Sequence, residues 1–386
     1  MIKVRVIGKG LVTPVGNTPE EVFQAAREGW SALRMHEGFP EPYFASLLDR
    51  DAFEGKSLFQ AAAIKAARAA IADAGIDPAA PDTGFVLSTI KGEVERIDSE
   101  DVSLAKTAAD VAAALGVTTQ PLVVSNACIS GLAALVQGMR MIRAGQYRKV
   151  IVCGAEIQSP FIVTGFQSLK ALSLNPCRPF DAARDGLNLG EAAAAVVLSD
   201  CDDMALCDYD GAERRRGAGG IAPQFVEDKM APWTLVQGAI RNDANHISGP
   251  SRTGEGSFNA LQAVLPHVKK EDLAFVNVHG TATLYNDEME AIALQRAGLL
   301  DVPINSMKGV FGHTMGAAGL LESILSMQAL EEGIVLPTRG FETLGVSAPV
   351  SVSAHERKAQ GNAFIKLLSG FGGVNGALLF RKGGAL

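Results

Sequence analysis

The sequence has few cysteines for its length, and their spacing excludes two common structural roles. Five cysteines occur among 386 residues, at positions 128, 153, 177, 201 and 207. Their number is odd and no pair has CxxC or metal-ligand spacing, so neither a disulfide framework nor a zinc site is predicted. Such cysteine usage is typical of proteins that work in a reducing cytoplasm.

Basic charge and long apolar runs are also scarce. Acidic residues outnumber basic ones, which gives a net charge of -7 at pH 7, whereas a nucleic-acid-binding protein would usually carry a basic patch. No apolar run reaches the length of a membrane span without charges or glycines, and residues 1–8 do not resemble a signal peptide. We therefore expect a soluble cytoplasmic protein that binds neither nucleic acid nor a membrane.

Small and aliphatic residues are abundant. Hydrophobic residues make up 47% of the chain and 41 residues are glycine, so the chain can bury a large core with closely packed elements. Apolar and Ala-rich segments alternate, which predicts helices at 58–74, 101–115 and 130–144, and strands at 2–7, 84–89, 121–125 and 150–152. This alternation indicates an α/β fold with a parallel sheet.

The later part of the chain repeats this order of elements. Residues 302–305 predict a short strand, 308–313 a glycine-containing turn and 314–332 a helix. The repeat indicates two structural duplicates, although a generic α/β architecture would give a similar rhythm. With a junction in the polar stretch 200–220, the halves are residues 1–203 and residues 204–386.

Cys128 stands at the border between a predicted strand and a predicted helix. The partial positive charge at a helix N-terminus favours thiolate and lowers a cysteine pKa from about 8.5 to roughly 3.5–7.5. Its small neighbours, Ala127, Ser130 and Gly131, would let a substrate approach and leave the Cys128 N–H for an acyl oxygen. A lone cysteine at such a border is more often structural, so the interpretation depends on its partners.

Two histidines stand among glycines at the ends of predicted elements. His279 follows the apolar segment 274–278 and opens a loop with the hydroxyl residues Thr281 and Thr283, and His313 closes the turn that begins at Lys308. A lone histidine in either place would usually be a packing or capping residue. Together with one cysteine, the two histidines form a set suited to covalent catalysis.

Charged residues lie near both histidines in the sequence. Lys308 and Glu322 could place a cation and a carboxylate beside His313 and fix its tautomer, with an ordinary surface ion pair as the alternative. Asp287 and Glu290 share one helix face and could cap that helix or bind Lys308. A metal site at these two carboxylates is the less favoured interpretation.

These motifs resemble, in their order, those of the β-ketoacyl synthases. Residues 126–131 are similar to the family's nucleophile motif, and residues 279–287 to its first histidine loop. Lys308 with residues 312–319 matches the family's lysine and second histidine, and residues 370–375 resemble its glycine-rich gating loop. The segment from Arg178 to Glu191 matches a further block, so the resemblance extends from residue 8 to residue 380.

The resemblance implies a fold and a set of roles. The fold would be a duplicated, thiolase-like arrangement of five layers, αβαβα, usually found as a homodimer. Cys128 would accept an acyl chain from the phosphopantetheine arm of an acyl carrier protein. His279 and His313 would stabilise the enolate formed when malonyl carrier protein loses CO2, and Lys308 would support them. The product would be a β-ketoacyl chain two carbons longer, in fatty-acid or polyketide and polyene synthesis.

Further residues take roles from the same resemblance. Thr281 and Thr283 would bind the pantetheine amides. Phe371 would gate the acyl pocket, and its N–H would hold the thioester oxygen together with that of Cys128. The structural supports would be Asp287, Glu290 and Glu322. No metal and no cofactor is expected beyond the phosphopantetheine that carries the substrates.

A few residues distinguish the alternative functions. A thiolase would need a second catalytic cysteine in the late glycine loop, where this chain has Gly370-Phe371-Gly372-Gly373. A chain-length-factor-like subunit of a ketosynthase heterodimer would usually lack the nucleophile. Ile129, Ala282 and Ser369 depart from the residues common in the family and leave the acyl chain undefined. We expect an acidic carrier protein to dock on basic residues such as Arg50, Lys56, Lys65 and Arg68.

Overall fold

Five strands from the first part of the chain form one half of the central sheet. The computed structural model describes residues 2–53, 57–96, 102–200 and 233–383. The strand order in this half is β5-β4-β6-β8-β1. β4 pairs in parallel with β5 and β6, whereas β8 is antiparallel to both β6 and β1. The strands are β1 (Arg5–Val12), β4 (Thr83–Ser88), β5 (Leu122–Val124), β6 (Lys149–Glu156) and β8 (Ala192–Ser199).

Five later strands repeat this order. Their sequence in the sheet is β11-β10-β15-β16-β9, with β10 parallel to β11 and β15, and β16 antiparallel to β15 and β9. The two halves therefore share both strand order and strand direction, which confirms the predicted duplication. The strands are β9 (Trp233–Asn242), β10 (Leu273–Asn277), β11 (Pro303–Asn305), β15 (Ala363–Gly370) and β16 (Val374–Lys382), with β13 (Ser351–Val352) added beside β11.

β1 and β9 join the halves edge to edge. Arg5 pairs with Thr234 and Val6 with Trp233, so the described strands form one eleven-stranded sheet. The predicted junction at 200–220 falls almost entirely within residues 201–232, which lie outside the described residues. The boundary between the halves at residue 203 therefore remains a prediction.

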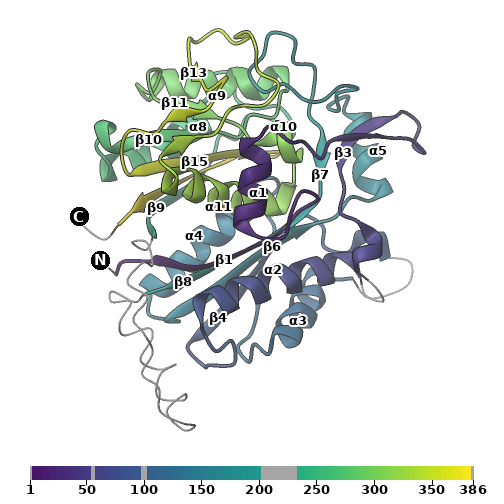
Figure 1. Cartoon of the computed structure of the whole chain (residues 1–386), viewed down its shortest axis with the longest axis vertical. Helices are drawn as coiled ribbons and strands as arrows, with labels where there is room; N and C mark the ends of the chain where they lie inside the picture. Colours follow the sequence, from purple (N-terminus) through teal and green to yellow (C-terminus); the bar gives the residue numbers. More distant parts are fainter. Residues whose placement is uncertain (1, 54–56, 97–101, 201–232, 384–386) are drawn as a thin grey trace.

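Helices make the remaining layers (Figure 1). α2 (Leu58–Ala74) and α3 (Leu104–Leu115) cover the outer face of the first half-sheet, and α8 (Glu255–Val264) with α9 (Leu284–Arg296) covers that of the second. Between the half-sheets lie α4 (Ser130–Arg143) and α11 (Ala318–Glu331), which contact strands of both halves and each other. The predicted five-layered αβαβα fold is confirmed.

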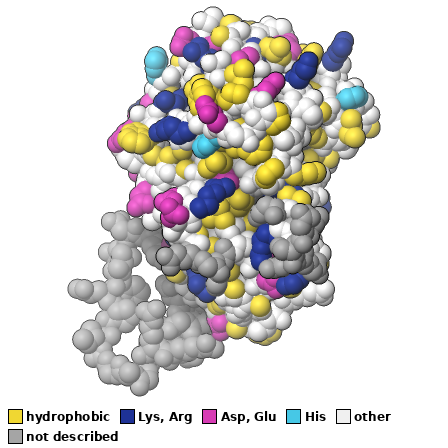
Figure 2. All heavy atoms as spheres, turned by 90° about the vertical axis from the view of Figure 1, so that its right-hand side faces the viewer, with side chains coloured by type: hydrophobic (Ala, Val, Ile, Leu, Met, Phe, Trp, Pro, Cys, Tyr) yellow, Lys and Arg dark blue, Asp and Glu magenta, His cyan; other side chains and the backbone are white. Residues whose placement is uncertain are grey.

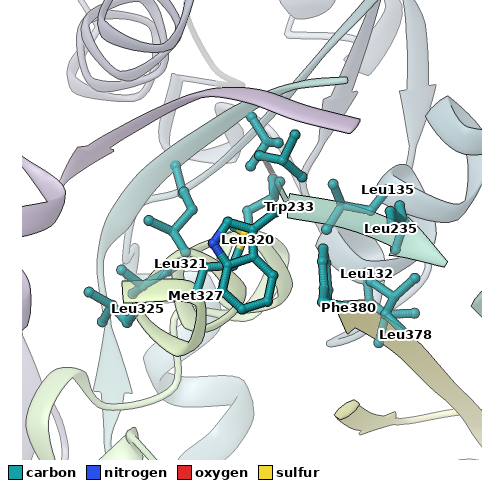
Figure 3. Close-up of a cluster of buried hydrophobic side chains, with 14 of the residues drawn as sticks. Leu132, Leu135, Trp233, Leu235, Leu320, Leu321, Leu325, Met327, Leu378 and Phe380 are labelled. Atoms are coloured by element: carbon teal, nitrogen blue, oxygen red, sulfur yellow. The ribbon is translucent and has the colours of Figure 1, made fainter. Parts of the chain in front are cut away.

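The middle layer holds a large apolar cluster. Leucines of α4 and α11 pack there against side chains of β9 and β16 (Figure 3). Trp233 closes this cluster and its indole N–H donates to Glu331 at 2.6 Å, which satisfies the polar end of a buried ring. Each aliphatic side chain fully buried in this way contributes about 1.5–3 kcal/mol. The two central helices are therefore held firmly between the sheets.

Short elements complete the described chain. α1 (Pro19–Arg27) begins after the N-cap residue Thr18, whose side chain accepts from Glu21 N. None of the helices in the described part of the chain combines the length and apolar character needed to span a bilayer. The other short elements are β2 (Arg34–His36), β3 (Tyr43–Ser46), α5 (Pro160–Ser168), β7 (Leu189–Gly190), α10 (Lys308–Phe311), β12 (Ile334–Val335) and β14 (Arg357–Lys358).

The first strand differs from its prediction. The sequence predicts a strand at residues 2–7, but β1 begins at Arg5 and continues through Gly8 and Gly10 to Val12. A Cβ at Gly8 would lie 2.2 Å from the carbonyl oxygen of Ala70, and one at Gly10 2.1 Å from that of Ala66. The glycines therefore let helix α2 rest directly on the strand, and they do not mark a turn.

Candidate active site

The main chain around Cys128 is held in a strained turn between β5 and α4. Ala127 has φ 46°, which is uncommon for a residue other than glycine. The Ser130 hydroxyl accepts from Asn126 N at 2.8 Å and donates to Ala127 O at 2.6 Å, and so ties the turn to the first residue of α4. Such strain persists only where the surroundings enforce it, and it often marks a functional site. Here it presents the Cys128 sulfur at the end of a buried helix.

Two backbone N–H groups meet the Cys128 sulfur. Those of Phe371 and of Cys128 itself favour the thiolate form of Cys128 and act to lower its pKa. The second chain segment approaches closely because residue 370 is glycine: a Cβ there would lie 3.1 Å from Cys128 N and 3.2 Å from the Ala127 Cβ. Paired N–H donors beside a nucleophile stabilise the oxyanion that forms when a thioester carbonyl is attacked. The predicted oxyanion site is thus sterically possible with these residues.

His279 follows directly after Val278, at the end of β10. Its backbone N–H and that of Gly280 each donate to Glu290 at 2.7 Å. Glu290 lies on α9 and is fully buried. The Asn286 amide also donates to Glu290, at 2.9 Å. This carboxylate therefore fixes the main chain that carries the histidine.

Asp287 holds the rest of the same loop. It accepts from Thr281 N at 3.0 Å and from Phe180 N at 2.7 Å, and Arg184 lies 3.9 Å from its carboxylate. The alternative in which Asp287 or Glu290 binds Lys308 is wrong, because Lys308 binds Glu322 at 2.5 Å. Asp287 and Glu290 thus both accept hydrogen bonds from the main chain of the His279 loop.

His313 is fixed by β7 and by its own loop. Its N–H donates to Asn188 O at 2.7 Å, and its carbonyl accepts from Gly190 N at 3.1 Å. The ring Nδ1 accepts from Met315 N at 3.3 Å. Because Nδ1 accepts, the neutral ring carries its proton on Nε2, and this nitrogen has no protein partner in the described chain. A buried donor of this kind is available to a ligand.

The reactive atoms converge. Cys128 Sγ and one ring nitrogen of each histidine lie within 4.8 Å of one another, and the His279 and His313 rings meet edge to face with centroids 5.0 Å apart. Zinc also takes cysteine and histidine donors. The Lys308 ammonium, however, acts on all three side chains, and this charge disfavours a metal cation between them. We therefore interpret the three residues as a nucleophile with two proton or hydrogen-bond donors.

A buried ion-pair cluster lies beneath the histidines. Glu322 on α11 binds Lys308 through one carboxylate oxygen and Lys366 through the other, each at 2.5 Å. All three side chains are at most 2% exposed. Lys308 and Glu322 can be predicted from the sequence, but Lys366 cannot, since a single lysine in the segment Ala363–Gly370 belongs to no motif.

Burial and these cations set the charge of the histidines. Burial, followed by the charges of Lys308 and Lys366, lowers the pKa of His313 well below 6.5. Burial, Lys308, His313 and Lys366 do the same to the pKa of His279. Both imidazoles are therefore neutral near pH 7 and can donate a hydrogen bond to a developing anion.

The predicted low pKa of Cys128 is wrong. Burial raises the pKa of this thiol to about 11, although Lys308 and the backbone N–H groups favour thiolate. The cause is desolvation, which depends on the tertiary structure and which the local strand-to-helix argument did not include. The resting side chain is a thiol, and it must transfer its proton when it attacks.

A pocket of about 360 Å³ opens from this centre to the surface. Its lining includes Cys128, both histidines, Thr281 and Thr283, and the two threonine hydroxyls lie 2.9 Å apart. The predicted site residues in the pocket therefore come from both halves of the chain. Apolar side chains at its outer part include Leu169, Leu284 and Tyr285, each more than half exposed.

Phe371 stands in this pocket on a braced loop. Its ring stacks on Phe166 of α5, with centroids 5.8 Å apart. Asn242 donates to Gly372 O at 2.8 Å, and Asn375 donates to Gly373 O at 2.9 Å. Phe166, Asn242 and Asn375 were not identified from the sequence, where no motif marks the first two. Asn375 lies within the glycine-rich motif and could have been found there.

The basic residues proposed for docking lie elsewhere. Arg50 makes two hydrogen bonds to Glu191, at 2.5 and 2.6 Å, and Arg68 donates to Ala114 O. Neither they nor Lys65 line the pocket, and Lys56 lies outside the described residues. The pocket lining instead contains Lys170. Figure 2 shows Lys and Arg side chains interspersed with hydrophobic ones on the α5 side of the molecule.

Comparisons with known proteins agree with this geometry. Residues 38–203 match the family described as "Beta-ketoacyl synthase, N-terminal domain", and residues 234–342 match "Beta-ketoacyl synthase, C-terminal domain". The tetracenomycin polyketide synthase ketoacyl synthase alpha subunit of Streptomyces glaucescens is 31% identical, over 98% of this chain and 97% of its own. The 3-oxoacyl-(acyl-carrier-protein) synthase 2 of Vibrio harveyi is 29% identical, over 98% of each chain.

Solved structures show the same fold. A β-ketoacyl synthase from Burkholderia phymatum STM815 superposes with a TM-score of 0.81 and 26% identity, over 99% of this chain and 100% of its own. The ishigamide ketosynthase/chain length factor structure gives a TM-score of 0.83 at 23% identity, over 98% of this chain and 99% of that chain.

Proposed function

Because this chain belongs to the β-ketoacyl synthase family, we propose that it is an elongating condensing enzyme with Cys128 as its nucleophile. The reaction is a decarboxylative Claisen condensation of malonyl carrier protein with an acyl thioester on Cys128. The product serves fatty-acid or polyketide synthesis. The observation that carries this proposal is the convergence of Cys128 Sγ and two neutral imidazoles within 4.8 Å.

Acyl transfer comes first. The Cys128 sulfur attacks the acyl thioester on phosphopantetheine, a new S–C bond forms, and the bond to the pantetheine sulfur breaks. The proton of the Cys128 thiol ends on the pantetheine thiol, with a neutral imidazole in reach to carry it. The N–H groups of Cys128 and Phe371 stabilise the oxyanion, and losing one such donor typically costs about 100- to 1,000-fold in rate.

Condensation follows on malonyl carrier protein. Loss of CO2 leaves an enolate, whose oxygen accepts hydrogen bonds from His279 and His313. Its carbon attacks the acyl carbonyl on Cys128, a C–C bond forms, and the released sulfur takes up a proton. The His313 proton on Nε2 has no hydrogen-bond partner among the described residues, so it is available to the enolate oxygen. A charged histidine pair would cost desolvation energy at this depth.

The pocket fits an arm that carries amides. Thr281 and Thr283 offer hydroxyls between the surface and the catalytic centre, and apolar side chains surround them. A volume of about 360 Å³ accommodates a chain of the width of phosphopantetheine, though not a whole protein domain. The carrier itself would remain outside, at the rim that contains Lys170 and Tyr285.

Two assemblies are compatible with the proposal. The partner in the reaction is an acyl carrier protein, the carrier named in the Vibrio harveyi relative. The chain would form a dimer, either with a second copy or with a ketosynthase-like subunit, since the Streptomyces glaucescens relative is named as an alpha subunit. The exposed edge of β5, directly before the catalytic turn, offers a surface for such a partner.

Replacement of the nucleophile tests the proposal. With acyl and malonyl carrier proteins as substrates, Cys128→Ala should lose covalent acylation in intact-protein mass spectra, and condensation should fall by at least about 1,000-fold. Cys153→Ala is the matched control, because Cys153 is also buried but its sulfur contacts only Ala63 O among the described hydrogen bonds. Wild-type condensation rates in Cys128→Ala would refute the proposal.

The same assays separate the alternatives. A chain-length-factor-like subunit would give no acylated Cys128 in either protein, alone or with a carrier. A thiolase would cleave β-ketoacyl thioesters without malonyl carrier protein. Two observations support the condensing enzyme over a thiolase: Cys128, His279 and His313 lie close together, and residues 370–375 of the glycine loop contain no cysteine.

A further inference from the structure

Lys366 is a buried cation of β15 that lies outside the motifs of the catalytic residues. It lies in the middle of β15, is completely buried, and points into the middle layer together with Phe364 and Leu368. Its ammonium donates to Asn277 Oδ1 at 2.6 Å, to Val278 O at 3.2 Å and to Glu322 at 2.5 Å. A lysine is almost never fully buried unless it is paired, and Lys366 is paired with Glu322.

Its contacts connect the two catalytic histidines. Asn277 and Val278 immediately precede His279, and Glu322 lies on the helix that follows His313. Lys366 therefore fixes the end of β10 to α11 through three donated hydrogen bonds. This link determines where the His279 loop starts relative to the other half of the site.

Charge counting gives Lys366 a second role. The titratable groups that face it are Glu322 on α11, Lys308 on α10 and Glu290 on α9, with both histidines beyond them. Asp287 on α9 is paired with Arg184. Burial raises the pKa of Glu290 to about 7, so Glu290 becomes negatively charged above that pH. If Lys308 balanced Glu322 alone, the ionised Glu290 would then leave this buried shell with an excess carboxylate. Lys366 supplies the third cation against three carboxylates.

We propose that Lys366 is a positioning residue of the catalytic centre, which keeps the buried shell from becoming net negative and so favours neutral histidines and anionic reaction states. The proposal rests on the condensing function proposed above. Negative charge beneath the site would favour imidazolium, which cannot accept a proton, and would disfavour both a Cys128 thiolate and an enolate. In agreement, Lys366 is one of the charges that lower the pKa of each histidine.

The sharpest test compares Lys366→Met with the double variant Lys366→Met/Glu322→Gln. Lys366→Met keeps the side-chain length and removes one cation, which leaves three carboxylates and two cations. The double variant restores the balance, with two of each. A purely structural role predicts that the second substitution adds damage, whereas the charge role predicts recovery. The comparison therefore separates the two explanations.

Two measurements report the effect of the Lys366 charge on Cys128 and on the histidines. Burial lowers the pKa of Lys366 to about 8, so the side chain is still mostly protonated at pH 7.5. In Lys366→Met, alkylation of Cys128 by iodoacetamide at pH 7.5 should slow by about three- to tenfold, which corresponds to a thiol pKa raised by roughly half to one unit. The acid limb of the pH–rate profile for malonyl carrier protein decarboxylation should move to higher pH by a similar amount. In the double variant, both values should return toward those of the wild type.

Several outcomes would overturn the inference. Unchanged alkylation and an unchanged acid limb in Lys366→Met would do so, as would a double variant no closer to wild type than the single one. If Lys366→Met does not fold, NMR of the wild-type lysine ammonium at pH 7 decides, because an uncharged Lys366 amine contradicts the proposal. Alkylation needs no carrier protein, so a chain that shows the predicted shift but never condenses would refute the proposed function alone.

Discussion

His279 and His313 are buried in their neutral form, which lowers the free energy of unfolding of the protein at acidic pH. The pKa of each is lowered well below 6.5, by burial first and then by neighbouring cations, whereas in the unfolded chain each titrates near about 6.5. Below that pH the unfolded chain binds protons that the folded chain does not. Their contribution to stability is therefore complete above about pH 6.5 and is lost as the pH falls toward the lowered folded values.

We predict that removing one histidine reduces this acid sensitivity. Between pH 7 and pH 5, wild-type protein should lose about 2 kcal/mol more unfolding free energy than His313→Asn, because one unmatched proton costs about 1.4 kcal/mol per pH unit. Urea denaturation at the two pH values measures the difference. Burial raises the pKa values of Asp287 and Glu290 to about 6 and about 7, so these two groups stabilise the fold as the pH falls. Their effect is the same in both proteins and cancels in the comparison. Equal losses in both proteins would contradict the prediction.

At the residue scale, the sequence predicted the site residues that stand in motifs. It missed the properties that depend on burial by distant parts of the chain. Cys128, His279, Lys308 and His313 are recognisable because each stands in a distinctive local pattern. Lys366 cannot be recognised in this way, since one lysine in an apolar strand is usually solvent-exposed. It is buried only because α11 covers that face of β15. The same effect, burial by distant elements, makes the expected low pKa of Cys128 wrong.

At the scale of elements, the site depends on how closely α4 and α11 cross. A Cβ on Gly319 would lie 2.3 Å from Leu132 N, and one on Gly131 2.8 Å from Gly316 O. Both obstacles are backbone atoms, which cannot rotate away. Cys128 precedes α4 and His313 precedes α11 by a few residues, so this crossing sets the distance between nucleophile and histidine.

We predict that Gly319→Ala separates these helices. The added methyl group should destabilise the fold by about 1–3 kcal/mol, as overpacking does in a dense core, and should slow acylation of Cys128 in the protein that remains folded. Gly165→Ala on α5 is the matched control, because nothing lies within 4 Å of the Cβ it would add. That control should be neutral or stabilising, since alanine favours helices over glycine by about 1 kcal/mol. Urea denaturation and acylation rates check both variants, and equal stabilities would contradict the prediction.

The sequence predicted the main elements closely, because their periodicity is local. The helix expected at 58–74 is Leu58–Ala74, and the one expected at 130–144 is Ser130–Arg143. The turn at 308–313 contains a short helix, and the first strand is displaced toward Gly8 and Gly10. Glycines that permit close packing cannot be distinguished from turn glycines until the neighbouring helix is known.

At the scale of the whole molecule, the site is formed by equivalent connections of the two duplicated halves. The β5-to-α4 connection carries Cys128, and the equivalent β11-to-α11 connection carries His313. Motif order could predict that these residues meet, because the resemblance covers both halves. The strand pairing that joins the halves, β1 with β9, follows no sequence pattern and is known only from the structure. The site therefore requires both halves to be folded together.

The edge of the sheet gives the last prediction, on assembly. β5 ends the strand order, Leu122 on it is 36% exposed, and the strand leads directly into the Cys128 turn. An open apolar edge is a natural site for strand pairing with another chain, so Leu122→Lys should shift sedimentation velocity from dimer to monomer and slow acylation. Met35→Lys, at a residue that is 56% exposed on β2, should leave both unchanged. A Leu122→Lys protein that still sediments as a dimer would place the interface elsewhere, whereas a monomer with reduced acylation would show that a partner at β5 helps to order the catalytic turn.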